Sequence, residues 1–402
     1  MANPFRTLRH RNFRLFWVGQ TLSLIGTWMQ TMATGWLALE LSNSSFLVGL
    51  VASASSLPVL LFSLHGGVLA DRVDRLKAVR ICQTLLAVEA GVLWWFTVTG
   101  HITIGWLIAL AAANGLISAF EIPARQALVI DLVDRSDLSG AIALNSSGFN
   151  LARVIGPGIG ALVIAKAGLA ACFGANALSY IAVLIGLFMM KIPARTAVIA
   201  TVNPMDGIRE LLRYMRDTPS INAVMKLVAV FSVFGIPYLT LMPVVARKVL
   251  HLDAGGYGLL LACVGVGGLC GALGLAAFGD RYSRGKLLSV ATLTFASLVI
   301  AFSFSRNIWL ACAVLLATGF AMIVNNALSN AMLQHLVPDQ MRGRLMSAYS
   351  LVVVGVSQVF GSFMAGALAE SLGVTVAIAG TAAIMLIYSW HAFFRRPELR
   401  AL

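Results

Sequence analysis

Two short charged segments with the same spacing interrupt an otherwise apolar chain. Each follows a glycine-rich apolar run and reads D-R-x-x-R-x-K, and the second copy lies about half a chain after the first. Their charged residues are Asp71, Arg72, Arg75 and Lys77 in the first copy and Asp280, Arg281, Arg284 and Lys286 in the second. A charged turn that occurs twice between apolar runs indicates an internally duplicated membrane protein.

These two segments are candidates for a conformational latch. Asp71 follows the end of one expected helix, and another expected helix, 345–369, begins just after Arg342. Because a helix N-terminus carries partial positive charge, Asp71 can bind this terminus and tie the two halves of the chain together. Asp280 can do the same at the start of 141–165. The alternative is that all these charges only set orientation and solvate a turn.

Three further charged residues fall within expected membrane spans or at their ends, where charge is costly and usually functional. Arg153 lies deep in an expected helix, and Glu121 is the first candidate for its neutralising partner. Glu121 can instead pair with Arg125 four residues later, although Pro123 between them makes a continuous helix there doubtful. Glu89 lies in the middle of another expected helix. We therefore name Glu121, Arg153 and Glu89 as coupling candidates, with Glu121 and Glu89 as the groups that can bind a proton.

The composition places these residues in a membrane. The chain has 402 residues, of which 59% are hydrophobic and 11% are charged, whereas a soluble domain has about 25% charged residues. The net charge is +13, but the basic residues form short clusters between apolar runs, which argues against nucleic-acid binding and suits anionic lipid headgroups. The five cysteines show no metal-ligand spacing and enzyme motifs are missing, so we expect no enzyme, cofactor or metal site.

We expect an all-α membrane protein with twelve transmembrane helices, because a bilayer core about 30 Å thick needs about 20 apolar residues per helix. The helices form two pseudo-symmetric six-helix bundles, 1–190 and 221–402. A cytoplasmic linker, 191–220, joins them, and 203–217 within it can form an amphipathic helix on the inner leaflet. The expected spans are 14–38, 46–69, 78–98, 104–122, 141–165, 171–190, 221–246, 255–278, 287–304, 309–333, 345–369 and 374–394.

The positions of the basic residues predict the orientation. Most of the 29 Lys and Arg residues fall on one side of the membrane when both termini are placed in the cytoplasm. The apolar run behind the basic N-terminus extends to about Leu39, which is too long for a cleaved signal segment. We therefore expect a multi-pass protein of the inner or plasma membrane.

The charged segments resemble the signature of the major facilitator superfamily, a loop between the second and third helices. The match runs from Gly67 to Lys77, and the second copy has Ala276 in place of the leading glycine. A narrower resemblance is to the branch of that superfamily that holds the enterobactin exporter and the macrolide-efflux proteins. It rests on the segments 123–126 (PARQ), 137–138 (DL) and 150–157 (N-x-x-R-x-x-G-P).

This resemblance implies further functional residues. Gly156, Pro157 and Gly158 resemble the fifth-helix signature of proton-coupled exporters, in which proline kinks the helix. Ala152 stands where that pattern has a glycine, so a packing kink is an equal alternative. In the family, helices 1, 4, 7 and 10 line the substrate cavity, although each polar residue on them can instead bond another helix. These residues are Gln20, Gln30, Asn114, Tyr238, Asn325, Asn326 and Asn330.

The sequence therefore predicts a secondary active transporter that works by alternating access as a functional monomer. We expect it to export a hydrophobic or amphipathic small molecule by proton antiport. One alternative is an importer or facilitator of a small solute, and an alternative of another class is a non-transporting membrane scaffold or receptor. The expected partners are membrane lipids, a small-molecule substrate and protons, without nucleic acid.

Overall fold

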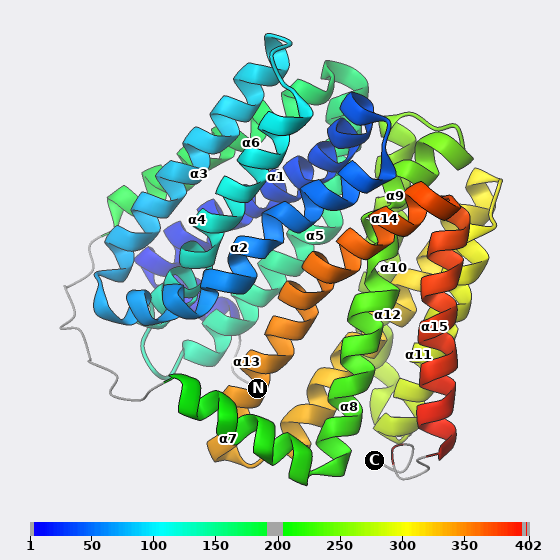
Figure 1. The fold of residues 1–402 in the computed structure, drawn as a ribbon. Helices are drawn as coiled ribbons and strands as arrows, with labels where there is room; N and C mark the ends of the chain where they lie inside the picture. The colour runs from blue at the N-terminus through cyan, green and yellow to red at the C-terminus, as the bar shows by residue number, and fades with distance from the viewer. Residues whose placement is uncertain (1–3, 191–203, 396–398, 400–402) are drawn as a thin grey trace. The chain divides into compact units, whose positions relative to one another are not determined.

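The computed structural model describes residues 4–190, 204–395 and 399, and these residues are almost entirely helical (Figure 1). Each of the twelve predicted spans coincides, within a few residues at most ends, with a helical stretch. The first six are α1 (Arg11–Ser42), α2 (Ser45–Arg72), α3 (Arg75–Val98), α4 (Ile104–Asp131), α5 (Leu138–Ala167) and α6 (Leu169–Met189). The fold class predicted from the sequence is confirmed.

The later helices are less regular. The seventh span, Pro219–Val249, begins as α8 (Pro219–Val230) and then changes between π-helical, 3₁₀ and short α-helical turns. The eleventh span consists of α13 (Asp339–Ser350), a π-helical stretch (Leu351–Gly361) and α14 (Ser362–Leu372). The other long helices are α10 (Ala254–Phe278), α11 (Arg284–Ser303), α12 (Ile308–Leu336) and α15 (Val374–Arg395).

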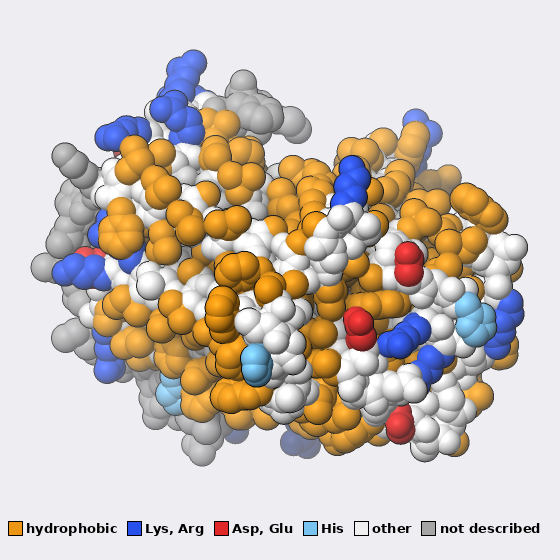
Figure 2. Space-filling view, turned by 90° about the horizontal axis from the view of Figure 1, so that it is seen from above, with side chains coloured by type: hydrophobic (Ala, Val, Ile, Leu, Met, Phe, Trp, Pro, Cys, Tyr) orange, Lys and Arg blue, Asp and Glu red, His pale blue; other side chains and the backbone are white. Residues whose placement is uncertain are grey.

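Eleven stretches of the described chain are long and apolar enough to cross a membrane. The remaining span, α1, has 32 residues and is therefore long enough, but it carries polar residues such as Gln20 and Gln30. Hydrophobic side chains cover much of the face seen in Figure 2, and many large ones are exposed elsewhere in the described chain, which suits a surface in contact with lipid. Among the most exposed are Leu178, Ile387 and Phe394. The chain is a multi-pass membrane protein.

The predicted end of the fourth helix at residue 122 is wrong, because α4 continues through Pro123 to Asp131. Proline has no N–H for the carbonyl of Ala119, four residues earlier. Gly66 of α2 lies against this carbonyl so closely that a Cβ atom at position 66 would clash with it. The close approach of a neighbouring helix therefore covers the carbonyl that proline leaves without its usual partner.

The chain forms two compact units, one made of 1–43 and 54–200 and the other of 44–53 and 201–402. The same pairings of helices recur in both, as expected for a duplicated protein. In the first unit α3 packs against α4 and α6, and in the second unit α11 packs against α12 and α15. The first turns of α2, residues 44–53, belong to the second unit, although the expected boundary at 190 would place them in the first.

The amphipathic helix expected at 203–217 is present as α7 (Pro204–Asp217), whereas 191–203 lies outside the described residues. Leu211 of α7 is buried in the core of the second unit, and Tyr214 and Met215 pack against the same core. Glu210 forms an ion pair with Arg344 of α13. The described apolar side chains of α7 are thus covered at least in part by protein, which differs from the expected position on the lipid surface.

Candidate functional site

A layer of polar side chains lies inside the first unit, between α1, α3, α4 and α6. It contains two carboxylates, Glu89 of α3 and Glu121 of α4, whose residues are only 6% and 5% exposed. A buried charge in apolar surroundings is costly unless other groups compensate it. The partners of each carboxylate therefore decide what each one can do.

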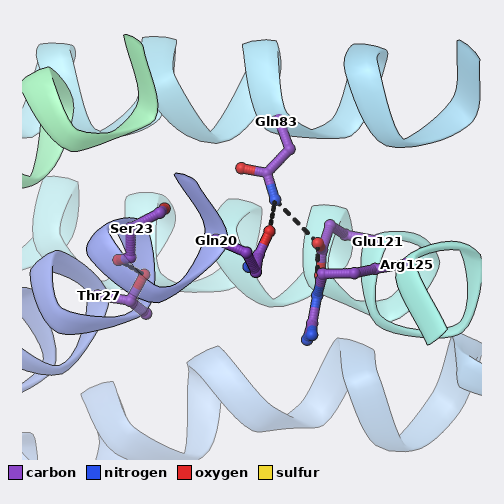
Figure 3. A network of polar contacts seen from close by, with 6 residues as sticks. All are labelled: Gln20, Ser23, Thr27, Gln83, Glu121 and Arg125. Carbon is purple, nitrogen blue, oxygen red and sulfur yellow. Dashed lines mark hydrogen bonds and ion pairs between the residues drawn. The ribbon is translucent and has the colours of Figure 1, made fainter. Parts of the chain in front are cut away.

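Glu121 is neutralised by a basic residue of its own helix. Arg125 Nε donates a hydrogen bond to Glu121 Oε1 at 2.9 Å, and both side chains are buried. Gln83 Nε2 of α3 donates to the same oxygen at 2.9 Å and also lies 3.5 Å from Gln20 Oε1 of α1 (Figure 3). The continuous α4 makes this pair possible, because it places positions 121 and 125 one turn apart.

Glu89 has amide partners instead. Asn114 Nδ2 of α4 donates to Glu89 Oε2 at 3.0 Å, and Gln30 Nε2 of α1 lies 3.3 Å from Oε2 and 3.5 Å from Oε1. The amide oxygen of Gln30 in turn accepts a hydrogen bond from Asn176 Nδ2 of α6 at 2.7 Å. Ser179 Oγ lies 3.2 Å from Asn176 Oδ1. One chain of hydrogen bonds therefore links α6, α1, α3 and α4 through this carboxylate.

Arg153 lies against an aromatic side chain. Its Cζ atom is 5.7 Å from the centroid of the Trp28 ring, and Trp28 meets Phe149 edge to face at 5.9 Å. Of the two partners considered for Glu121, the structure shows Arg125. Arg153 thus contributes a guanidinium group to a partly exposed aromatic cluster on α1 and α5.

The proline of the fifth helix does not interrupt it, since α5 runs unbroken through Pro157. Gly156 is buried against α1, where an added Cβ would lie 2.6 Å from the Cβ of Trp28 and 3.0 Å from the carbonyl oxygen of Ile25. The glycine therefore permits the close approach of α1 and α5. This geometry supports the packing alternative, and a coupling role for 156–158 stays a prediction.

Several residues expected at a substrate cavity are buried inside the units. Gln20, Gln30, Tyr238 and Asn325 are each at most 7% exposed. The first two belong to the polar layer, and Asn325 Nδ2 of α12 donates to Thr292 Oγ1 of α11 at 2.5 Å. In this structure most of these polar groups join neighbouring helices. The three partly exposed candidates, whose place at a cavity stays a prediction, are Asn114, Asn326 and Asn330.

The side chains of Asp71 and Asp280, the expected latch acids, lie outside the described part of the structure. Arg75 Nη1 contacts Asp131 Oδ2 at 2.9 Å and the carbonyl of Ala127 at 3.3 Å, so it joins the start of α3 to the end of α4. Arg281 stacks on Phe278 at 5.1 Å. Arg72 is exposed and Arg284 is partly buried. The described contacts of Arg75 and Arg281 thus stay within one unit.

The repeated spacing also has a local cause. Asp74 caps α3 by accepting a hydrogen bond from the backbone N–H of Lys77 at 3.1 Å. Ser283 caps α11 in the same way, with the N–H of Lys286 at 3.4 Å. A side-chain oxygen at this position satisfies a free backbone donor at the start of a helix. Both copies of the motif therefore begin a helix at the equivalent residue.

Sequence reasoning missed a clamp in the second unit, where the start of α2 packs against α14. Glu370 Oε2 accepts hydrogen bonds from the backbone N–H groups of Ser45 at 2.7 Å and Phe46 at 3.3 Å. Phe46 meets Phe363 edge to face at 5.5 Å, and Gly49 packs closely against Gly366. The signal in the sequence was an acid directly after the expected span 345–369.

The variant Glu370→Gln is expected to loosen this clamp. The carboxylate interacts favourably with the partial positive charge of the α2 N-terminus, and a lost cap costs about 1 kcal/mol. The peptide covering 44–53 should then exchange its amide hydrogens roughly five-fold faster. Hydrogen-exchange mass spectrometry checks this result, with Glu40→Gln, at an exposed position of α1, as the control. Equal exchange in both variants would show that Glu370 does not hold α2.

Comparison with known proteins places the whole chain among transport proteins. The family model described as "Transmembrane secretion effector" matches residues 2–401. The staphyloferrin A transporter of Staphylococcus aureus is 24% identical over 96% of this chain and 97% of its own length. The multidrug efflux pump Tap of Mycolicibacterium fortuitum is 25% identical over 94% and 93% of the two chains. The enterobactin exporter EntS of Salmonella typhi is 23% identical over 84% and 80%.

Solved structures of transporters share the fold. A bacterial homologue of the human lysosomal transporter Spinster, in an inward-facing and unoccupied conformation, superposes with a TM-score of 0.78. It is 14% identical and is covered over 98% of its chain, against 100% of this one. The nucleoside transporter NupG gives a TM-score of 0.72 at 13% identity, over 96% of this chain and 98% of its own.

Proposed function

Since the chain belongs to the family of transmembrane secretion effectors and is a membrane transporter of the major facilitator type, we propose that it exports a hydrophobic or amphipathic small molecule by proton antiport. Export is supported by similarity, over 80% or more of both chains, to proteins named as an efflux pump and an exporter. Antiport is supported by the observation that carries the proposal, a carboxylate buried without a basic partner inside a lipid-embedded bundle. A proton is the simplest ion that such a group binds.

The proposed substrate class follows from the chemistry of the partly exposed residues. The three relatives are named for different cargo, namely staphyloferrin A, enterobactin and many drugs. In this chain, the guanidinium of Arg153 lies beside the rings of Trp28 and Phe149. A cation next to aromatic surface favours molecules that combine a ring system with polar or anionic groups.

The proposed cycle is alternating access by a functional monomer with both termini in the cytoplasm. The orientation rests on the distribution of Lys and Arg. Asp71 and Asp280 remain the proposed latch acids. This role is supported by the equivalent positions of the two motif copies in the two halves of the duplicated chain. Import is the second candidate, because the relative named as the staphyloferrin A transporter is not described as an exporter.

An accumulation assay tests the proposed export. Cells that overexpress the chain, cells that lack its gene and cells with empty vector are loaded with a panel of amphipathic dyes, antibiotics and siderophores. We expect lower accumulation of at least one compound on overexpression and higher accumulation on deletion. The opposite changes would indicate import. Unchanged accumulation of every compound would favour a scaffold or receptor.

A further inference from the structure

We propose that Glu89 is the group that binds and releases the exchanged proton, and that Glu121 is a structural ion. The inference rests on the proposed antiport and assigns its proton to one residue. Both carboxylates are buried in the same unit at nearly equal exposure, so burial does not separate them. The difference between them lies in their partners.

The basic partner of Glu121 makes it a poor carrier. Arg125 is one helical turn away on the same helix, at 2.9 Å. A rearrangement between helices leaves this distance unchanged, so the arginine stabilises the ionised carboxylate throughout a transport cycle. Protonation of Glu121 would also leave the buried Arg125 charge without its counterion. The pair is therefore suited to a permanent structural role.

Glu89 has no such restraint. No described Lys or Arg forms an ion pair with it, and its hydrogen-bond partners are the neutral amides of Gln30 and Asn114. Two N–H donors reduce the cost of the ionised form, whereas a buried acid without a cation also has an accessible neutral form. Small changes in these donors therefore decide whether the carboxyl group holds a proton.

The orientation of the amides selects a proton over a metal ion. Gln30 and Asn114 present their N–H₂ groups to the carboxylate, and the oxygen of Gln30 already accepts from Asn176 Nδ2. Metal ions such as magnesium bind oxygen ligands, whereas the amide groups that face Glu89 are N–H donors. Within the described chain, no group of three or more His, Cys, Asp or Glu side chains is placed to hold a metal.

The hydrogen-bond chain provides a means of coupling. Asn176 of α6 fixes the orientation of Gln30 on α1, and Gln30 then donates to Glu89 on α3. A shift of α1 against α3 lengthens the Gln30 contact, which is already 3.3 Å or more, and removes a donor from the carboxylate. Proton binding then forms one O–H bond at Glu89, and the reverse shift expels the proton.

The helices packed around Glu89 carry few other titratable groups near this layer in the described chain. Tyr180 of α6 is buried, and its hydroxyl group interacts electrostatically with Glu89 and Glu121. On α4 the Glu121–Arg125 pair faces the same layer, and on α3 the thiol of Cys82 lies near Glu121. The side chains that α1 contributes to the layer, Gln20 and Gln30, are amides. Glu89 is thus the acid in this layer that lacks a charged partner.

Infrared difference spectroscopy tests the assignment without knowledge of the substrate. The purified protein in lipid is titrated with acid, and the carbonyl stretch of protonated carboxylic acids is recorded for the wild type, Glu89→Gln and Glu40→Gln. Because the chain has 16 Asp and Glu residues, the assignment rests on the difference between spectra. We expect one titrating component of the wild-type band to be missing from Glu89→Gln and to remain in Glu40→Gln. Melting temperatures of the three proteins check that each is folded.

Two outcomes would overturn the assignment: identical titrating bands in the wild type and Glu89→Gln, or a difference between these two spectra that does not change with pH. A folding defect does not obscure the test, because Glu89→Asp keeps an acid at the site and should show a shifted band. Failure of the antiport itself is distinguishable. A band that belongs to Glu89 in a protein whose substrate flux moves no protons would leave the site in place and remove the proposed exchange.

Discussion

The variant Arg125→Gln is expected to lower the free energy of unfolding by about 3–5 kcal/mol, because it leaves the charge of Glu121 buried without a cation. Both side chains are under 10% exposed, so water cannot replace the lost partner. The remaining contact from Gln83 at 2.9 Å is a hydrogen bond from a neutral amide. It cannot supply the missing charge.

The double variant Glu121→Gln, Arg125→Gln is expected to recover most of this loss, because it removes both charges together. Thermal unfolding of the detergent-solubilised protein, followed by size-exclusion chromatography, gives the order of stabilities. Arg135→Gln is the matched control, since Arg135 is exposed at the end of the same region. A double variant less stable than Arg125→Gln alone would contradict the proposed neutralising pair.

The second large effect is expected at Gly319 of α12. A Cβ atom there would clash with the backbone carbonyl of Val264 on α10, and Gly267 of α10 meets the carbonyl of Leu316 in the same way. Gly319→Val must therefore push two helices apart, at a cost of about 1–3 kcal/mol or more.

The same thermal assay checks this prediction against Gly380→Val on α15. An added Cβ at Gly380 has no neighbouring heavy atom within 4 Å, so this substitution changes side-chain size without a clash. We expect a clearly lower melting temperature for Gly319→Val and little change for Gly380→Val. Equal melting temperatures would show that the α10–α12 crossing tolerates expansion.

The helices could be predicted because a membrane span is defined by its own length and apolarity. The end of α4 could not, since Pro123 is a helix breaker in water. The carbonyl of Ala119, which Pro123 leaves without an N–H partner, is covered only by the tertiary approach of Gly66. The same uncertainty left the partner of Glu121 undecided between Arg125 and Arg153. Because α4 is continuous through Pro123, Arg125 lies one turn from Glu121 and pairs with it.

The polar layer was only half predicted. The sequence pointed to Glu89, Gln30 and Asn114 one by one, but their meeting depends on how α1, α3 and α4 pack. Gln83 and Asn176 were missed because they lie on the third and sixth helices, whereas the family resemblance pointed to polar residues on helices 1, 4, 7 and 10. An amide in the middle of an apolar run was the signal, since such a group needs a partner in lipid.

The glycines show the same limit. Glycine is frequent in the second, fifth, eighth and eleventh expected spans, and small residues favour close packing of membrane helices. In the second unit, Gly267 and Gly271 of α10 pack against α12. Sequence thus predicted that helices approach closely at these residues, whereas the identity of the neighbour required the structure.

Proton movement during transport is the most direct test of the proposed antiport. Inverted membrane vesicles that contain the protein are acidified inside, and a lumenal pH indicator is followed while a substrate found in the accumulation assay is added. Antiport predicts that substrate entry drives protons out and raises the lumenal pH, in proportion to the substrate taken up. Substrate uptake with an unchanged lumenal pH would contradict it.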